Sequence, residues 1–270
     1  MWTRETRKQH DRDDLRYPSD LTDAEWQILA PLFPPPAKTG RRRSWLMREV
    51  VNAIFFVLRG GCPWRMLPAH FPPHQTTYRW FTRFRDDGTW ESLDHHLVSL
   101  DRQRAGRAPS PTAGVIDTQS VKTTEAGGPR GYCPAKKLNG RKRHVLVDTD
   151  GRGLELQIHA ASVQDRDGAV PVLQAAHARF PTLQRVFADS VYAGERVANA
   201  TAIVVEIVRK LPDQVGFKIL PRRWVVERFF AWVNRNRRLA KDFEATIASA
   251  TAFLHAACVM LLTRRLARWG

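Results

Sequence analysis

The chain has 270 residues, with 43 lysines and arginines against 27 aspartates and glutamates, so its formal net charge is +16. A hydrophobic share of 43% and nine tryptophans exclude a disordered polycation. No apolar run approaches the ~18–20 residues of a membrane span, and the charged N-terminus lacks the apolar segment of a secretion signal. The charge therefore indicates a polyanionic partner, nucleic acid ahead of a membrane surface.

Cysteine usage points to a reducing compartment. The three cysteines, Cys62, Cys133 and Cys258, lie far apart and form no C-x-x-C pair. An odd and sparse set of this kind argues against a disulfide framework or a structural zinc site. We therefore expect three free thiols in a cytoplasmic protein.

The N-terminal third of the chain has helical periodicity. Residues 1–17 are charged and aperiodic, which indicates a flexible N-terminus. Thr22 to Glu25 make a capping box that begins a first helix, and Ser44 is placed to cap a second. Further helices are expected at Trp45–Arg59, Thr77–Asp86 and Trp90–Leu100. Residues 18–103 thus read as an all-helical N-terminal domain.

A change of period follows a linker at residues 104–112, which is rich in proline, serine and arginine. Short apolar runs alternate with helical patterns from there, so residues 113–270 read as an α/β domain. The expected strands are Gly114–Asp117, Val145–Asp148, Leu154–His159 and Val186–Asp189, with a helix at Asp165–Arg179 and a broken helical region at Arg222–Arg268.

Three acids stand out in this second domain. Asp117 and Asp189 each follow an apolar strand pattern, and such strand ends commonly build sites. Glu227 is the single acid among seven basic residues between positions 222 and 241. Converging carboxylates would bind Mg²⁺ or Mn²⁺, and two such ions suit phosphodiester displacement. The alternative is that the aspartates are turn or cap residues and that Glu227 pairs with Arg223.

Long blocks of the chain are similar to the DDE transposases of bacterial insertion sequences, in the family numbered five, which is grouped with the family numbered four. The blocks are LTDAEWQILAPLFPPP and REVVNAIFFVLRGGCPWRMLPAHFPPHQTTYRWFTRFRDDGTW in the helical part, and VIDTQSVKT, KKLNGRKRHVLVDTDG, FADSVYAG and RRWVVERFFAWVNRNRRLAKDFE in the second domain. The resemblance covers nearly the whole chain. It implies an RNase H-like catalytic domain, a mixed sheet with flanking helices, behind a small DNA-binding helical domain.

The resemblance also implies site residues. Asp117, Asp189 and Glu227 correspond to the catalytic, metal-binding acids, which would hold Mg²⁺ or Mn²⁺ as two ions. The family's tyrosine, arginine, glutamate and lysine signature is only partly present. Arg223 fits its arginine, but Leu220 stands at the tyrosine position and Asn234 at the lysine position. Arg235 or Arg238 can take over the lysine's contact with phosphate.

Basic residues are the candidates for holding DNA. Residues 129–144 read as a flexible basic loop beside the acids, with a solvated connection as the alternative. Arg79 and Arg83 lie one helical turn apart and can place a helix on DNA. The DNA-binding candidates are Arg79, Arg83, Lys136, Lys137, Arg141, Lys142, Arg143, Arg223, Arg235 and Arg238.

The aromatic residues of the closing helix and three histidines are expected to have structural roles. Trp224, Phe229, Phe230 and Trp232 are expected to pack the closing helix on the sheet, with base stacking as the alternative. His144, His159 and His177 show no metal-ligand spacing and are expected to be neutral and structural.

The sequence thus predicts a transposase that binds the terminal inverted repeats of its element, cuts DNA there and joins the ends to target DNA. Because two ends must be joined, a homodimer on DNA is expected. The protein would act in the cytoplasm at the nucleoid, and no membrane partner is expected. The alternatives are a transposase-derived DNA-binding protein without catalysis and an RNase H-like nuclease that does not join strands.

Overall fold

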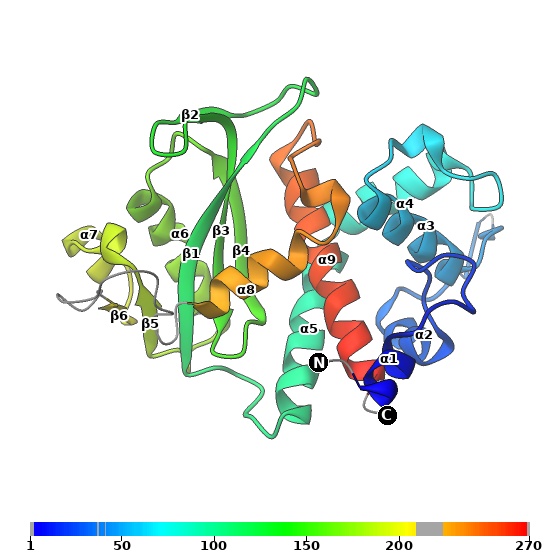
Figure 1. Ribbon diagram of the computed structural model, residues 1–270, viewed down its shortest axis with the longest axis horizontal. Helices are drawn as coiled ribbons and strands as arrows, with labels where there is room; N and C mark the ends of the chain where they lie inside the picture. The colour runs from blue at the N-terminus through cyan, green and yellow to red at the C-terminus, as the bar shows by residue number, and fades with distance from the viewer. Residues whose placement is uncertain (1–2, 37, 41, 209–223, 269–270) are drawn as a thin grey trace.

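The computed structural model describes residues 3–36, 38–40, 42–208 and 224–268. A helical part and a sheet part lie side by side and are linked by long helices near the centre (Figure 1). The α-helices are α1 (Arg4–His10), α2 (Asp23–Leu29), α3 (Met47–Gly60), α4 (His74–Asp86), α5 (Thr89–Arg104), α6 (Asp165–Arg179), α7 (Glu195–Ala198), α8 (Trp224–Val233) and α9 (Ile247–Ala267). Short 3₁₀ turns cover Ala30–Leu32, Trp64–Met66, Ser190–Tyr192 and Arg237–Leu239.

The helices of the N-terminal part follow the expected order. Thr22 caps α2 through a complete capping box, as predicted, and Gly61 ends α3 with a left-handed φ of 73°. The predicted cap at Ser44 is wrong, because α3 begins at Met47 and Leu46 occupies the N-cap position. The N-terminal segment contains α1 and is held to α2 by a bidentate ion pair between Arg12 and Glu25.

The sheet contains antiparallel and parallel strands. Its strands are β1 (Ala113–Lys122), β2 (Gly131–Cys133), β3 (Leu138–Asp148), β4 (Gly153–Ala160), β5 (Arg185–Ala188) and β6 (Val204–Ile207). The order is β2-β3-β1-β5-β6, and β4 also pairs with β3. The β1, β3 and β4 pairings are antiparallel, whereas β5 and β6 extend the sheet in parallel. With helices on both faces, this is the predicted RNase H-like fold.

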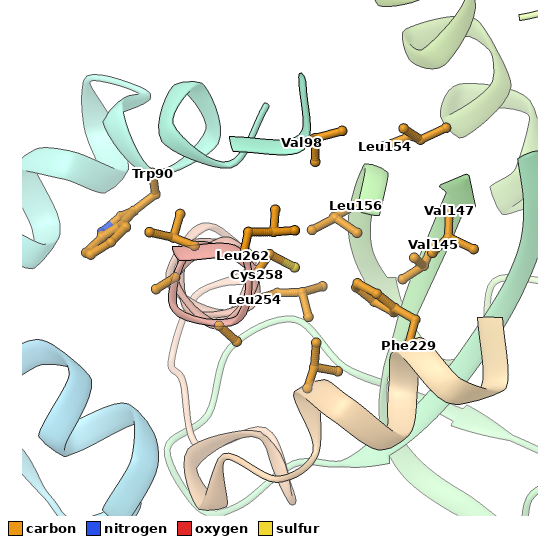
Figure 2. Packing of buried hydrophobic residues seen from close by; sticks show 14 of the residues in the cluster. Trp90, Val98, Val145, Val147, Leu154, Leu156, Phe229, Leu254, Cys258 and Leu262 are labelled. Atoms are coloured by element: carbon orange, nitrogen blue, oxygen red, sulfur yellow. The ribbon is translucent and has the colours of Figure 1, made fainter. Parts of the chain in front are cut away.

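Different helices cover the two faces of the sheet (Figure 1). Helix α6 packs on one face so closely that a side chain at Gly168 would clash with His144 and His159. Helices α8 and α9 cover the other face (Figure 2), where Phe229 lies against Val145 and Val147. Asp117 and Val145 are direct cross-strand partners, so Asp117 belongs to the face under α8.

The predicted flexible loop at residues 129–144 is wrong, because most of it forms β2 and β3. The run RKRH at residues 141–144 alternates like a strand: Arg141 and Arg143 point to the α8 and α9 side, and Lys142 points to the α6 side. The cations are buried because partners come from distant segments. Arg141 reaches Asp242 at 3.0 Å, and Lys142 reaches Asp165 at 2.6 Å.

Helix α9 joins the two parts into one hydrophobic core. It packs on α2, α3, α4 and α5 of the helical part and on β4 and α8 of the sheet part. Trp90 of α5 and Leu156 of β4 flank it on either side (Figure 2). The helix is long and apolar enough to cross a membrane by length and composition, but 72% of its most apolar window is buried in the protein. Its apolarity is accounted for by the shared core.

A buried ionic network fixes α5 and α9 to the β3–β4 hairpin. Arg152 lies 2.6 Å from Asp101 of α5 and 3.0 Å from Asp148 of β3, and all three residues are buried. Arg102 and Arg265 complete the network at 2.5 Å from Asp148 and 3.0 Å from Asp101. Asp148 also accepts the amides of Asp150 and Arg152, and so closes the turn between β3 and β4.

Replacing Arg152 by alanine is expected to lower the free energy of unfolding by about 3–5 kcal/mol, because two buried carboxylates lose a shared partner. Chemical denaturation measures this. Arg185→Ala is the matched control, since the Arg185–Glu206 pair is exposed and is worth no more than about 1 kcal/mol. Equal losses in both variants would contradict the network's role.

Candidate active site

Two of the three acids lie near the pairing of β1 with β5. These strands pair in parallel, with Val115 opposite Phe187 at the end of the ladder. Asp117 lies two residues further along β1, and Asp189 lies two residues after Phe187, just past the end of β5. Because the pairing is parallel, both acids follow the same end of the ladder, and neighbouring strands lie about 4.8 Å apart.

The strand ends differ from those predicted. Strand β1 continues past Asp117 to Lys122, because its partner β3 is equally long. Strand β5 does end at Ala188, so Asp189 is free of the ladder and caps the following 3₁₀ turn, its Oδ1 accepting the Val191 amide at 2.9 Å. A capping function therefore accompanies the position beside Asp117.

Tyr192 lies beneath this pair of aspartates and is a residue that sequence reasoning missed. Its side chain is buried, and its hydroxyl lies 3.2 Å from His144 Nε2. Burial raises the pKa of Tyr192 well above its ordinary value, and the negative charges of Asp117, Asp165 and Asp189 raise it further. Both aspartates are thus among the charges that act on this phenol. Tyr192 follows Asp189 by three residues, a spacing visible in the sequence.

Glu227 lies on the same side of the sheet but apart from the two aspartates. It is exposed, in the first turn of α8, and α8 packs on β1 and β3. The N-terminal end of α8 lies next to β1 (Figure 1). Within the ranges that the structure describes, however, no three histidine, cysteine or acidic side chains are grouped closely enough to hold a metal ion. Among the described residues, the three acids thus form no ready-made metal site.

The cation that reaches Asn234 is Arg143. Its guanidinium donates to Asn234 Oδ1 and Gln119 Oε1, both at 3.0 Å, and to the Leu239 carbonyl at 2.7 Å. Burial lowers the pKa of Arg143 to about 10. Gln119 lies two residues after Asp117 on the same face of β1, so Arg143 links the strand of Asp117 to the end of α8. Sequence reasoning named Arg143 but missed this link.

Arg235 and Arg238, the two candidates for the lysine's role, have different surroundings. Arg235 is exposed just after α8. Arg238 is buried, pairs with Glu244 at 2.7 Å and donates to the Cys62 carbonyl. Arg238 would have to leave these partners to touch DNA.

The other DNA-binding candidates differ in exposure. Arg141, Lys142 and Arg143 are buried against partners inside the protein. The basic residues of 129–144 that remain exposed are Arg130, before β2, and Lys136 and Lys137 in the β2–β3 turn. Arg79 and Arg83 are exposed on α4, where Arg83 lies 5.0 Å from the ring of Trp80. Arg223 and Leu220 lie outside the described residues.

The aromatic residues of α8 follow the expectation in part. Phe229 and Phe230 are buried, as predicted. Trp224 is 40% exposed, and the guanidinium of Arg228 lies 4.2 Å from its ring, so its predicted packing on the sheet is wrong. It sits in the first turn of α8, three residues before Glu227.

Comparisons with known proteins agree with this geometry. Residues 108–262, more than half of the chain, match the family model described as "Transposase DDE domain". Residues 21–93 match the model "Putative transposase of IS4/5 family". The chain therefore belongs to the DDE transposases, and within them to those of insertion sequences. Domains of this class generally use divalent metal ions and act on DNA.

Two relatives come from Burkholderia cepacia. One, "Putative transposase for insertion sequence element IS402", is 31% identical over 138 residues, which is 48% of this chain and 65% of the relative. The chain thus aligns with just under two thirds of that relative's length. The other, "Insertion element IS402 uncharacterized 16.2 kDa protein", is 31% identical over 121 residues, which is 42% of this chain and 80% of the relative.

The histidines beneath the site are held neutral, as expected for His144 and His159. Burial, together with nearby His159 and Lys142, lowers the pKa of His144 from 6.5 to about 3. Burial also lowers the pKa of His159. A histidine with a depressed folded-state pKa stabilises the fold above its unfolded pKa, and that stability is lost as the pH falls, because only the unfolded chain takes up the proton.

His144→Asn is therefore expected to flatten the acid side of the stability profile. The wild-type protein should lose free energy of unfolding progressively from pH 6.5 toward pH 3, and the variant should lose less over the same range. Urea titrations at a series of pH values measure both slopes. Identical slopes would show that His144 takes up its proton in the folded protein too.

Proposed function

We propose that this protein is the transposase of its insertion sequence, using Asp117, Asp189 and Glu227 to cut DNA at the element's ends and to join those ends to target DNA. The observation that supports the proposal is the parallel pairing of β1 with β5, whose register, continued two residues past Val115 and Phe187, would bring Asp117 opposite Asp189. The match to the transposase DDE domain spans all three acids.

The two aspartates fit a hard divalent cation, because both offer carboxylate oxygens from adjacent strands on one face. Mg²⁺ or Mn²⁺, as two ions, would supply an activated water or hydroxyl nucleophile and stabilise the leaving oxygen. The chain's own residues orient the donors. Strand pairing fixes the backbone of Asp117, and the capping bond from Val191 fixes one oxygen of Asp189.

Glu227 completes the site only when α8 brings it toward the aspartates. Arg143 lies at the other end of this helix, where it fastens Asn234 and Leu239 to β1 and β3. The buried Phe229 holds the middle of α8 against the sheet. The first turn, with exposed Trp224 and Glu227, is the part of α8 placed to meet DNA.

The DNA contacts of this proposal come from exposed cations. Arg79 and Arg83 on α4 would hold the terminal inverted repeats, while Lys136, Lys137 and Arg235 would contact backbone phosphates nearer the acids. Residues 18–103 would act as the DNA-binding domain and residues 113–270 as the catalytic domain. The protein would work as a homodimer on the two ends, in the cytoplasm at the nucleoid.

One observation favours a second candidate, a transposase-derived DNA-binding protein without catalysis. The three acids are not grouped in the described structure, and Asn234 replaces the family's lysine. Incubation of the protein with Mg²⁺ and duplexes carrying the element's ends separates the candidates, since only the transposase cuts them. Supplying pre-cut ends with a plasmid target then separates it from a nuclease that cannot join strands.

Asp117→Asn, Asp189→Asn and Glu227→Gln are each expected to reduce Mg²⁺-dependent cleavage by more than about 100-fold, a loss that even indirect metal contacts can cause. DNA binding without metal should persist, because these variants remove negative charge. Gel-based cleavage and fluorescence anisotropy measure the two properties.

Glu195→Gln is the matched control, because Glu195 is exposed on α7 and loses the same charge. It should cut DNA at the wild-type rate. Full cleavage by the Glu227→Gln variant would remove Glu227 from the proposed site, whether or not the Asp117→Asn and Asp189→Asn variants lose cleavage.

A further inference from the structure

A cavity that none of the three acids lines lies where the N-terminal helices meet the ends of α3, α8 and α9. Its volume is about 540 Å³. Ala257 and Met260 of α9 form part of its apolar floor. Its cationic wall consists of Arg12, Arg59, Arg235, Arg264 and Arg268, which we call the arginine pocket. These residues come from four separate segments, since Arg264 and Arg268 both belong to the end of α9, so only the fold assembles them.

The arginine pocket carries an excess of positive charge. Its lining includes five arginines but only two acids, Asp11 and Glu25. Glu25 is already engaged by Arg12 at 2.7 Å and lies 4.0 Å from Arg264. Arg59 donates to the carbonyl of Arg235, and Arg268 to that of Arg264. Across the described residues, neither Arg59 nor Arg268 forms an ion pair with an acid.

The guanidinium groups of the pocket repel one another. Burial lowers the pKa of Arg264 to about 10, and Arg12 is the first of the neighbouring charges that lower it further. Burial lowers the pKa of Arg59 as well, followed by the charges of Arg235 and Arg12. The buried Nε donors of Arg12 and Arg264 have no hydrogen-bond partner in the part of the chain that the structure describes. An anion in the cavity would relieve the repulsion and accept these donors.

We propose that the arginine pocket binds phosphodiester groups of a DNA strand, an inference that rests on the proposed action on DNA. Planar guanidinium groups bind phosphate oxygens with paired hydrogen bonds, so several converging arginines suit this group. The pocket is also close to the candidate active site. Trp232 in its lining follows Glu227 by five residues of α8, about 7.5 Å along the helix axis. That length corresponds to about two nucleotides of a DNA strand.

Through the pocket, residues of the helical part and of the catalytic part would bind the same DNA strand. Arg12 and Arg59 belong to the N-terminal part, whereas Arg235, Arg264 and Arg268 belong to the C-terminal helices. A strand whose scissile phosphodiester lies at the acids would have its flanking phosphates in the pocket. Binding there would position the strand rather than react with it.

The test is a double variant, Arg59→Gln with Arg268→Gln, in the full-length chain. Fluorescence anisotropy with a labelled duplex of about 30 base pairs, without divalent ions, gives Kd at several salt concentrations. The variant should bind about tenfold more weakly, and the slope of log K against log salt should be shallower by about 1–2, as lost phosphate contacts require.

A matched control removes the same charge elsewhere. Arg185→Gln with Arg196→Gln loses two guanidiniums that pair with Glu206 and Asp167 on the far side of the sheet. This control should keep its affinity within about twofold. Arg59→Lys with Arg268→Lys keeps the charge and should recover most of the binding. Thermal unfolding of all the variants shows that each is folded.

The outcomes separate the pocket from the proposed function. If the wild-type protein cuts DNA but the glutamine double variant keeps wild-type affinity and salt slope, the pocket proposal is overturned and the transposase proposal stands. If the variant binds poorly and Glu227→Gln still cuts, the pocket stands and the catalytic assignment fails. Stabilisation by inorganic phosphate that the double variant abolishes, with DNA binding unchanged, would assign the pocket to free phosphate and overturn its assignment to DNA.

Discussion

The parallel pairing of β1 with β5 is the constraint on which the site depends. Strand β1 has antiparallel β3 on one side and parallel β5 on the other, so it cannot shift without breaking both ladders. A slip of one residue would turn Asp117 away from the α8 face. The register therefore fixes Asp117 on the face that α8 crosses, next to the strand that Asp189 follows. The rest of the candidate site is arranged around this pair.

The basic residues behind the net charge of +16 are of two kinds, buried and exposed. Part of it is internal, because Arg141, Lys142, Arg143 and Arg238 are buried and hold segments together. The first three tie β3 to α6, to the end of α8 and to the segment before α9, and Arg238 pairs with Glu244. Other cations are exposed, among them Arg79 and Arg83 on α4 and Lys136 and Lys137 in the β2–β3 turn. Composition alone counts both kinds equally, although only the second kind can attract DNA without rearrangement.

Helices α8 and α9 connect the helical part of the molecule to the sheet part. Helix α9 packs on the helical part and on the sheet, and the network around Asp101 and Asp148 ties it to α5 and the β3–β4 hairpin. Helix α8 carries Glu227 at one end and reaches the arginine pocket at the other. Because both helices lie between the two parts, a strand held by the pocket is held close to the acids.

The sequence by itself determined the local elements and the identity of the acids. Periodicity and short-range chemistry predict the capping box at Thr22, helix α6 and the strand before Asp189. The resemblance to the transposase family supplied the three acids. Tertiary structure decided which cations are internal, because Asp242 and Asp165 reach the strand run at Arg141 and Lys142 from distant segments. It also brought Arg143 to Asn234 and assembled the arginine pocket. Such contacts depend on the packing of segments far apart in the chain, which no local pattern records.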